Sequence, residues 1–171
     1  MERNDVVKIK GKPVTLMGTP LKVGDKAPDF TLLDNSLNPV SFSESKGKPR
    51  LISVVTSLDT GTCSIQTRTF NKELEKLADK ATAYTISADL PFAQGRFVKE
   101  NEIEKIQVLS DYQTNSFGRD YGLLVKETRL LARAVIVVDK NDTITHLEIV
   151  PEGTSEPNYT TALEALKKVL D

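Results

Sequence analysis

The 171-residue chain contains a single cysteine, Cys63, and the residues around it are of types that support thiol chemistry. A continuous apolar strand pattern at 50–55 precedes it, then a run of turn and helix-capping residues at 56–62, and a helical pattern follows. Backbone N–H groups at a helix start lack helical partners, and the helix dipole adds partial positive charge there. Both effects favour the thiolate, which is the nucleophilic form of cysteine. A lone cysteine can equally be a small buried apolar side chain, so other residues must decide.

The helix that follows Cys63 is predicted from the spacing of its apolar residues. They recur at intervals of three to five and are expected to form one buried stripe: Ile65, Phe70, Leu74, Leu77 and Ala78. Thr60 or Thr62 can cap this helix, because hydroxyl side chains accept hydrogen bonds from free N–H groups at helix starts.

Strands and helices alternate along most of the chain. Strands are predicted at 6–9, 13–17, 29–33, 40–42, 50–55, 83–87, 106–109, 134–139 and 143–150, and helices after Cys63, from Pro91, within 114–122 and near the C-terminus. The alternation predicts an α/β fold with a central mixed sheet flanked by helices, which is the layout of a thioredoxin-like domain. We expect one domain over 1–171, with residues 1–20 forming an N-terminal β-hairpin extension.

Three separated segments carry a family signature. They read SLDTGTC at 57–63, SADLPFAQ at 87–94 followed by Arg96 and Phe97, and LLARAV at 130–135. In type and order they resemble the motifs of thiol peroxidases, the Tpx subfamily of atypical two-cysteine peroxiredoxins. The resemblance runs from about residue 7 to the C-terminus, which argues against chance. It implies a peroxiredoxin fold, no cofactor and a homodimer.

The resemblance implies that Cys63, Thr60 and Arg133 are the catalytic residues of a thiol-dependent peroxidase. Such an enzyme reduces hydrogen peroxide and alkyl hydroperoxides and leaves a sulfenic acid on the cysteine. A guanidinium stays charged and donates several hydrogen bonds, so Arg133 can stabilise negative charge on the leaving oxygen. The Thr60 hydroxyl can orient the peroxide. Taken alone, Thr60 fits a helix cap and Arg133 a surface ion pair.

Two positions depart from the family pattern. Thr56 stands where peroxiredoxin loops usually carry proline, so we expect a slightly looser loop with an additional hydroxyl. Val98 stands where these thiol peroxidases carry a resolving cysteine, and it is expected to pack in a half-buried helix position.

With one cysteine, the chain cannot form an intramolecular disulfide. The sulfenic acid must then be reduced by an outside thiol, either thioredoxin or a low-molecular-weight thiol, and overoxidation should be easier. The alternative is a redox sensor or partner-binding protein that uses Cys63 oxidation without turnover. A disulfide reductase is disfavoured because Cys63 has no C-x-x-C partner.

Composition excludes several other classes of protein. Net charge is -1 and the basic residues form no stripe, which argues against a nucleic-acid partner. The charged N-terminus lacks the apolar core of a signal peptide and apolar runs are strand-sized, so we expect a cytoplasmic protein with no membrane contact. The single histidine, His146, lies in an edge-strand pattern with no metal-ligand spacing, so no metal site is predicted. Ser87 and Asp89 are expected to be structural.

Overall fold

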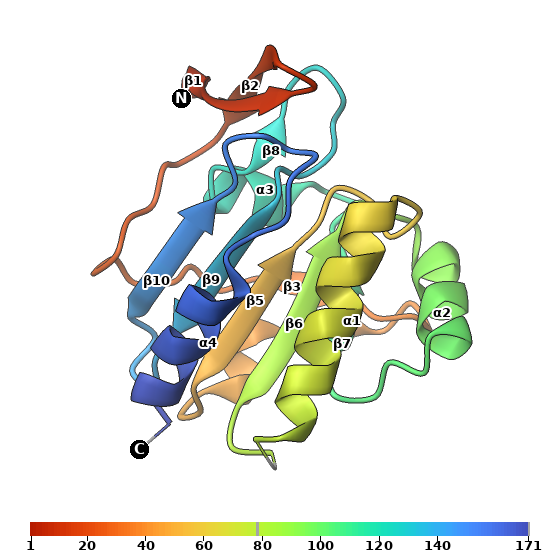
Figure 1. The fold of residues 1–171 in the computed structure, drawn as a ribbon, viewed down its shortest axis with the longest axis vertical. Helices are drawn as coiled ribbons and strands as arrows, with labels where there is room; N and C mark the ends of the chain where they lie inside the picture. The colour runs from red at the N-terminus through yellow and green to blue at the C-terminus, as the bar shows by residue number, and fades with distance from the viewer. Residues whose placement is uncertain (78, 171) are drawn as a thin grey trace.

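The computed structural model describes residues 1–77 and 79–170 and arranges them as two sheets with helices around the larger one (Figure 1). The strands are β1 (Glu2–Ile9), β2 (Lys12–Met17), β3 (Thr31–Leu33), β4 (Pro39–Ser41), β5 (Arg50–Val54), β6 (Thr82–Ser87), β7 (Gln107–Ser110), β8 (Leu124–Val125), β9 (Ala134–Val138) and β10 (Ile144–Ile149). The helices are α1 (Gly61–Glu75), α2 (Pro91–Glu100), α3 (Ser116–Asp120) and α4 (Tyr159–Lys168), and a 3-10 turn covers Phe42–Ser45. Two predicted positions, Ala78 and residue 171 at the end of the expected domain, lie outside the described residues.

The larger sheet has the strand order β10-β9-β5-β6-β7-β3-β4. Its centre is parallel, since β5 pairs with β6 and β6 with β7 in that sense, whereas β9, β10, β3 and β4 pair antiparallel. Figure 1 shows α1 and α4 against one face of this sheet and α3 on the other side. The predicted α/β architecture with a mixed sheet is therefore confirmed.

Strand β5 lies at the centre of the sheet and every one of its residues is buried. Its side chains alternate between two apolar clusters. Leu51 joins the cluster under α1 and α4, whereas Ile52 and Val54 join the cluster on the opposite face. Burial on both faces is what a continuous apolar run predicts. Because β5 is packed on both sides, the loop that leads from it to Cys63 starts from a fixed position.

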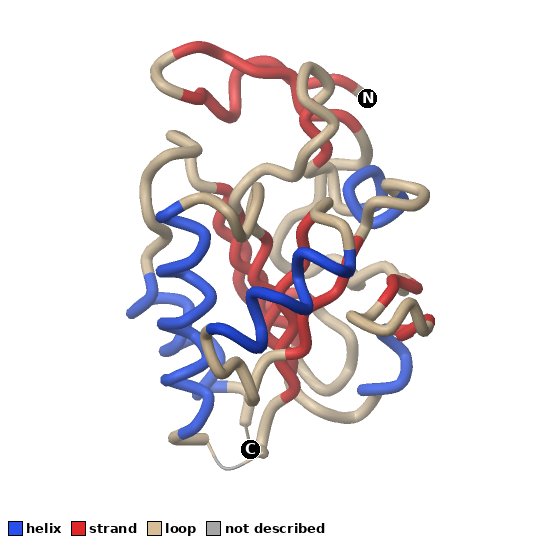
Figure 2. Tube along the Cα trace, turned by 90° about the vertical axis from the view of Figure 1, so that its right-hand side faces the viewer, coloured by secondary structure: helices blue, strands red, loops and turns tan. Residues whose placement is uncertain are grey.

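The N-terminal hairpin is confirmed and forms a second, smaller sheet with β8 in the order β1-β2-β8. Figure 2 shows it at one end of the molecule, beyond the larger sheet. The sequence patterns did not predict β8, because a two-residue strand such as Leu124–Val125 shows no periodicity. The predicted helix within 114–122 is shorter, since Asn115 has a left-handed φ of 56° and the helix covers Ser116–Asp120.

The buried face of α1 differs from the predicted stripe. Ile65 was expected inside but is 41% exposed. The buried residues are Cys63, Gln66, Thr67, Phe70, Asn71 and Leu74. They follow the helical period faithfully, but half of them are polar, so a search for apolar residues placed the start of the face incorrectly. A helix that buries polar side chains near its N-terminus needs partners for them, and these partners make up the site described next.

Candidate active site

Cys63 lies in the first turn of α1, directly after the loop that follows β5. The residue has 0% exposed surface and belongs to an apolar cluster with Leu58, Val55 and Val135. Its sulfur nevertheless has a charged neighbour, because Arg133 Nη1 donates to Cys63 Sγ over 3.2 Å. The structure therefore buries the sulfur but places it directly against a guanidinium.

Arg133 reaches the sulfur because of the strand order. It immediately precedes β9, and β9 pairs antiparallel with β5 so that Ala134 lies opposite Val54. This register brings the residue before β9 beside the loop that leaves β5. Arg133 is only 3% exposed, and its Nε and Nη2 donate to the Gly153 carbonyl over 3.2 and 2.9 Å.

The guanidinium of Arg133 is buried without a carboxylate. Within the described part of the chain, the ion pairs join other residues, and none involves Arg133. A buried cation with no anion nearby is strongly unfavourable. The group that Arg133 Nη1 contacts directly is the sulfur of Cys63, so the guanidinium is in position to stabilise negative charge on the reacting atoms.

Gln66 completes the contact between the two residues, and the sequence analysis did not nominate it. Its Oε1 accepts from Arg133 Nη1 over 3.0 Å, and its Nε2 donates to Ser53 Oγ over 2.8 Å. Both Gln66 and Ser53 are fully buried. The signal that could have found Gln66 is its spacing, because a polar residue three positions after Cys63 lies on the same face of the helix.

Thr60 is the residue that precedes the helix and has extended backbone geometry. Its hydroxyl makes no cap bond to the helix and donates instead to the Ser57 carbonyl over 2.9 Å. Its own carbonyl accepts from Ser64 N. The structure thus places Thr60 on the exposed turn next to Cys63, whereas it brings Cys63 and Arg133 into direct contact.

Asp89 holds the turn that carries Thr60. Its carboxylate accepts from Ser57 Oγ over 2.7 Å and from Leu58 N over 2.8 Å. It also accepts from Ser87 Oγ at the end of β6, over 2.7 Å. Ser87 and Asp89 together attach the loop after β5 to the neighbouring strand, and their structural role stays a prediction.

Thr56 connects the same loop to the segment before Arg133. Its hydroxyl donates to the Leu131 carbonyl over 3.0 Å. Proline at this position could make no such bond, so the additional hydroxyl predicted from the sequence has found a partner. The looser loop expected there stays a prediction.

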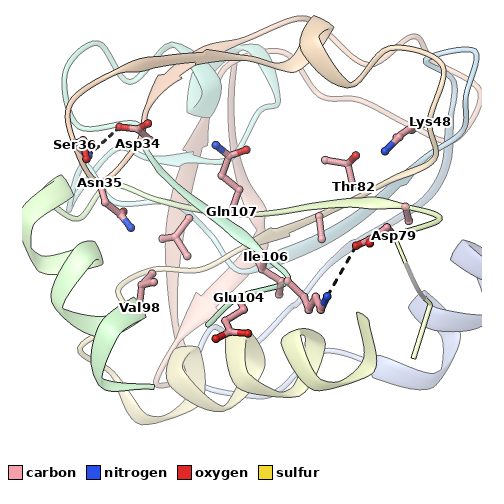
Figure 3. Close-up of a pocket in the computed structure, with 14 residues that line it drawn as sticks. Asp34, Asn35, Ser36, Lys48, Asp79, Thr82, Val98, Glu104, Ile106 and Gln107 are labelled. Atoms are coloured by element: carbon pink, nitrogen blue, oxygen red, sulfur yellow. Dashed lines mark hydrogen bonds and ion pairs between the residues drawn. The ribbon is translucent and has the colours of Figure 1, made fainter. Parts of the chain in front are cut away.

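A cavity of about 600 Å³ lies away from Cys63, between the starts of β6 and β7 and the turn after β3 (Figure 3). Val98 points toward it from α2 and is half-buried, as expected for that position. Acidic and basic side chains both line the cavity, among them Asp79, Glu104 and Lys48. Because neither Cys63 nor Arg133 lines it, this cavity is not the thiol site.

Other groups singled out in the sequence do not form a second centre. Among residues 1–77 and 79–170, no cluster of three or more His, Cys, Asp and Glu side chains could hold a metal ion. His146 lies on the edge strand β10, and burial lowers the pKa of its imidazole while Glu148 opposes this shift. No helix in the described ranges is long and apolar enough to cross a membrane.

Comparison with known proteins identifies the family. The family model described as Redoxin matches residues 22–163. A thiol peroxidase of Bacillus subtilis (strain 168) is 51% identical over 164 residues, which cover 96% of this chain and 98% of the relative. The chain is a redoxin of the thiol peroxidase family. A thiol peroxidase of Halalkalibacterium halodurans shares the same identity and the same coverage of both chains.

A solved structure supports the fold of this thiol peroxidase family member. The crystal structure of a peroxiredoxin-like protein from Aquifex aeolicus superposes with a TM-score of 0.90 and 35% identity, covering 96% of this chain and 97% of that one. The family resemblance and the thioredoxin-like peroxiredoxin fold predicted from the sequence are therefore confirmed. The roles of Cys63, Thr60 and Arg133 follow as proposals from the geometry.

Proposed function

We propose that this chain is a thiol-dependent peroxidase that reduces hydrogen peroxide and alkyl hydroperoxides at Cys63. The observation that carries the proposal is the buried guanidinium of Arg133, whose Nη1 lies 3.2 Å from Cys63 Sγ with no carboxylate beside it in the described residues. The curated relatives that bear the name thiol peroxidase support the same activity.

The reaction begins with attack of the Cys63 thiolate on the terminal oxygen of the peroxide. A sulfur–oxygen bond forms as the O–O bond breaks, so the sulfur is oxidised by two electrons and the peroxide is reduced. The other oxygen leaves as hydroxide or alkoxide and takes a proton to become water or an alcohol. Cys63 is left as a sulfenic acid. Negative charge moves from sulfur to the leaving oxygen, so a cation close to both atoms lowers the barrier.

Arg133 has a donor to spare for that oxygen. Both hydrogens of Nη1 are used, one on Cys63 Sγ and one on Gln66 Oε1, whereas Nη2 donates to Gly153 and has a second hydrogen left. A peroxide beside the sulfur can accept this remaining N–H. Because Gln66 and Gly153 hold the guanidinium in one orientation, the donor is in position before the peroxide arrives.

Thr60 is the proposed second contact to the peroxide. Its hydroxyl donates to the Ser57 carbonyl, so the lone pairs of the hydroxyl oxygen can accept a hydrogen bond. The terminal O–H of a hydroperoxide is a suitable donor. Thr60 would then align the O–O bond, and Arg133 would stabilise the charge that develops on it.

The peroxide must move atoms aside to reach the sulfur. A residue with 0% exposed surface meets solvent only after its neighbours shift. The turn at 57–60 lies next to Cys63 in the chain, its Leu58 is buried in the same apolar cluster as Cys63, and Asp59 and Thr60 are exposed. We propose that small displacements of this turn, which the side chain of Asp89 holds through Ser57 and Leu58, control access to Cys63.

The second half of the cycle needs a thiol from outside the chain. Cys63 is the only cysteine and Val98 cannot resolve the sulfenic acid. An external thiol would condense with it, releasing water and forming a mixed disulfide, and a second thiol would release Cys63. We propose thioredoxin or a low-molecular-weight thiol as this reductant, with sulfinic acid formation when peroxide is in excess.

The test uses the fully reduced protein and one equivalent of hydrogen peroxide. Mass spectrometry with a sulfenic-acid trap should find the modification on Cys63, and steady-state consumption should proceed when dithiothreitol or thioredoxin is added. The Cys63→Ser variant is the matched control and should consume no peroxide. An unmodified Cys63, or peroxide consumption by Cys63→Ser at the wild-type rate, would contradict the proposal.

One observation favours a second candidate, a redox sensor. The sulfur is buried and the chain carries no resolving cysteine, which suits a single oxidation event followed by a mixed disulfide with a partner protein. The same experiment separates the two functions. Repeated turnover with an added thiol favours the peroxidase, whereas one stoichiometric oxidation with no turnover favours the sensor.

We further propose that residues 1–171 form one domain that acts in the cytoplasm as a homodimer, with 1–20 as its N-terminal extension. The family resemblance supports both the dimer and the location. Light scattering after size-exclusion chromatography tests the dimer, and cell fractionation tests the location.

A further inference from the structure

Glu152, in the loop between β10 and α4, makes a set of contacts that the proposed mechanism does not use. Its carboxylate accepts from Gly11 N over 2.8 Å and from Lys10 N over 3.3 Å, both in the turn of the N-terminal hairpin. It also accepts from Thr154 N over 2.9 Å and from Thr154 Oγ1 over 2.7 Å. The hydrogen bonds from Thr154, Gly11 and Lys10 lower the pKa of this carboxyl to about 2, so it is ionised at neutral pH. The side chain of Glu152 thus joins the loop between β10 and α4 to the turn of the N-terminal hairpin.

The backbone on either side of Glu152 is joined to β1 as well. Lys8 N donates to the Pro151 carbonyl and Gly153 N donates to the Lys8 carbonyl, each over 2.8 Å. The fit between the two segments is close, since a Cβ added at Gly153 would lie 3.2 Å from Ile9 Cγ1. The loop at 151–154 is therefore bound along the edge of the hairpin.

This loop continues to the sulfur. The Gly153 carbonyl accepts from Nε and Nη2 of Arg133, and Arg133 Nη1 donates to Cys63. On the other side, Thr62 Oγ1 donates to the Thr154 carbonyl over 3.2 Å, which attaches the loop to the residue before Cys63. Hydrogen bonds on either side of the Glu152–Gly153 backbone thus connect the hairpin turn with the reactive atom.

We propose that Glu152 is a positioning residue for the peroxidase reaction: it holds the 151–154 loop on the N-terminal hairpin so that the Gly153 carbonyl keeps the Arg133 guanidinium on the sulfur. The inference rests on the proposed function. The hairpin then has a catalytic purpose, although none of its residues touches Cys63 or Arg133 in the hydrogen bonds of the described chain.

The chain offers a matched control in Glu127. This glutamate also fastens the hairpin with a carboxylate, accepting from Thr15 N over 2.8 Å. The bond from Thr15 lowers the pKa of Glu127 too. The hydrogen bonds of Glu127 lead to β2 and not toward Arg133. The Glu127→Ala variant therefore measures how much the peroxide rate changes when the hairpin is loosened without disturbing the 151–154 loop.

The experiment measures the second-order rate of reduced Cys63 with hydrogen peroxide by stopped flow, together with thermal unfolding. Displacing a catalytic group by about 1 Å can reduce a rate by up to about 100-fold. We expect Glu152→Ala to reduce the peroxide rate by about tenfold, and Glu152→Gln, which keeps one acceptor oxygen, by less. Glu127→Ala should change the rate by less than about twofold, even where it lowers the melting temperature as much.

A double-mutant cycle with Arg133→Lys separates positioning from general destabilisation. If Glu152 acts through Arg133, Glu152→Ala should have no further effect on the rate once position 133 carries lysine. Equal fold-losses in both backgrounds, or an equal loss in Glu127→Ala, would overturn the proposal. Should Glu152→Ala fail to fold, Glu152→Gln supplies the cycle. Failure of the proposed function would be visible separately, as a wild-type protein that does not react with peroxide.

Discussion

Asp89 and Glu152 hold the reactive end of the molecule from two sides, and the partners of the two carboxylates differ. Asp89 accepts from Ser57 and Leu58 in the loop after β5 and from Ser87 at the end of β6, so its partners belong to a central strand and to the loop that leads from the neighbouring strand to α1. Glu152 accepts from its own loop and from the hairpin turn about 140 residues earlier. The turn that carries Thr60 is thus attached to the central sheet, whereas the loop whose Gly153 carbonyl binds Arg133 is attached to the N-terminal hairpin.

The difference between Asp89 and Glu152 separates the part of the site that the α/β core holds from the part that the hairpin holds. The strand-to-helix turn between β5 and α1 presents Cys63 and Thr60, so the central sheet itself positions these two residues. The guanidinium needs a further support, and here the support reaches it through Gly153 from outside the central sheet. The following predictions test the two sides separately.

The largest effect is expected for Arg133→Lys. Lysine carries a point charge and cannot bond Cys63, Gln66 and Gly153 together, so the peroxide rate should fall by about 100-fold. Stopped-flow oxidation of the reduced protein measures this rate. Arg68→Lys, the same change on the exposed face of α1, is the control and should leave the rate unaltered. A loss of less than about threefold would remove Arg133 from the chemistry.

Asp89→Asn tests the side of the site that is held by the sheet. The amide presents N–H groups toward Ser57 and Leu58, which are donors themselves, so the turn should loosen and stability should fall by about 1–3 kcal/mol. We expect the peroxide rate to fall by about tenfold, because Thr60 would lose its fixed position. Asp59→Asn, on the exposed part of the same loop, is the control. Wild-type kinetics in a destabilised Asp89→Asn protein would show that the turn needs no such support.

Thr56→Val tests the connection between the two sides. Valine keeps the shape of threonine but loses the hydrogen bond to the Leu131 carbonyl, so the free energy of unfolding should fall by about 0.5–1.5 kcal/mol. The peroxide rate should change by no more than about threefold, since neither Thr60 nor Arg133 loses a direct partner. Chemical denaturation and stopped flow measure the two quantities. A rate loss as large as that of Asp89→Asn would mean that the two sides are coupled through Thr56.

The smallest effect is expected in how the contribution of Glu152 to the stability of the protein varies with pH. The pKa of Glu152 is lowered from 4.5 to about 2, so its bonds contribute stability above pH 4.5, and this contribution is lost as the pH falls through 2. Glu152→Gln should therefore lower the melting temperature at neutral pH, and the difference from wild type should shrink toward pH 2. Calorimetry at a series of pH values measures it. A difference that is independent of pH would show that the charge of Glu152 contributes nothing.

Much of this arrangement could be predicted from sequence. Continuous apolar runs located the central strands, and the turn residues before Cys63 located the helix start. The contact between Cys63 and Arg133 was expected only from the family resemblance, because residues 70 positions apart show no local pattern that would join them. That an arginine before a strand is buried follows from the pairing of β9 with β5, which becomes visible only in three dimensions.

The remaining parts were missed for physical reasons that differ from residue to residue. The spacing of apolar side chains predicts that Ile65 is buried, whereas half of the side chains that α1 buries are polar. Gln66 was overlooked for the same reason. Glu152 bonds mainly to backbone N–H groups, which every residue except proline possesses, so its partners leave no signature in the sequence.

The position of Gly153 has a consequence for protein synthesis. The guanidinium of Arg133 is oriented by a carbonyl that follows Cys63 by 90 residues in the sequence, so Cys63 leaves the ribosome well before that carbonyl does. Until the 151–154 loop has emerged and bound to β1, the nascent chain lacks the hydrogen bonds between Arg133 and the Gly153 carbonyl. The contact between Arg133 and Cys63 can therefore reach its final geometry only late in synthesis, after the 151–154 loop has been made.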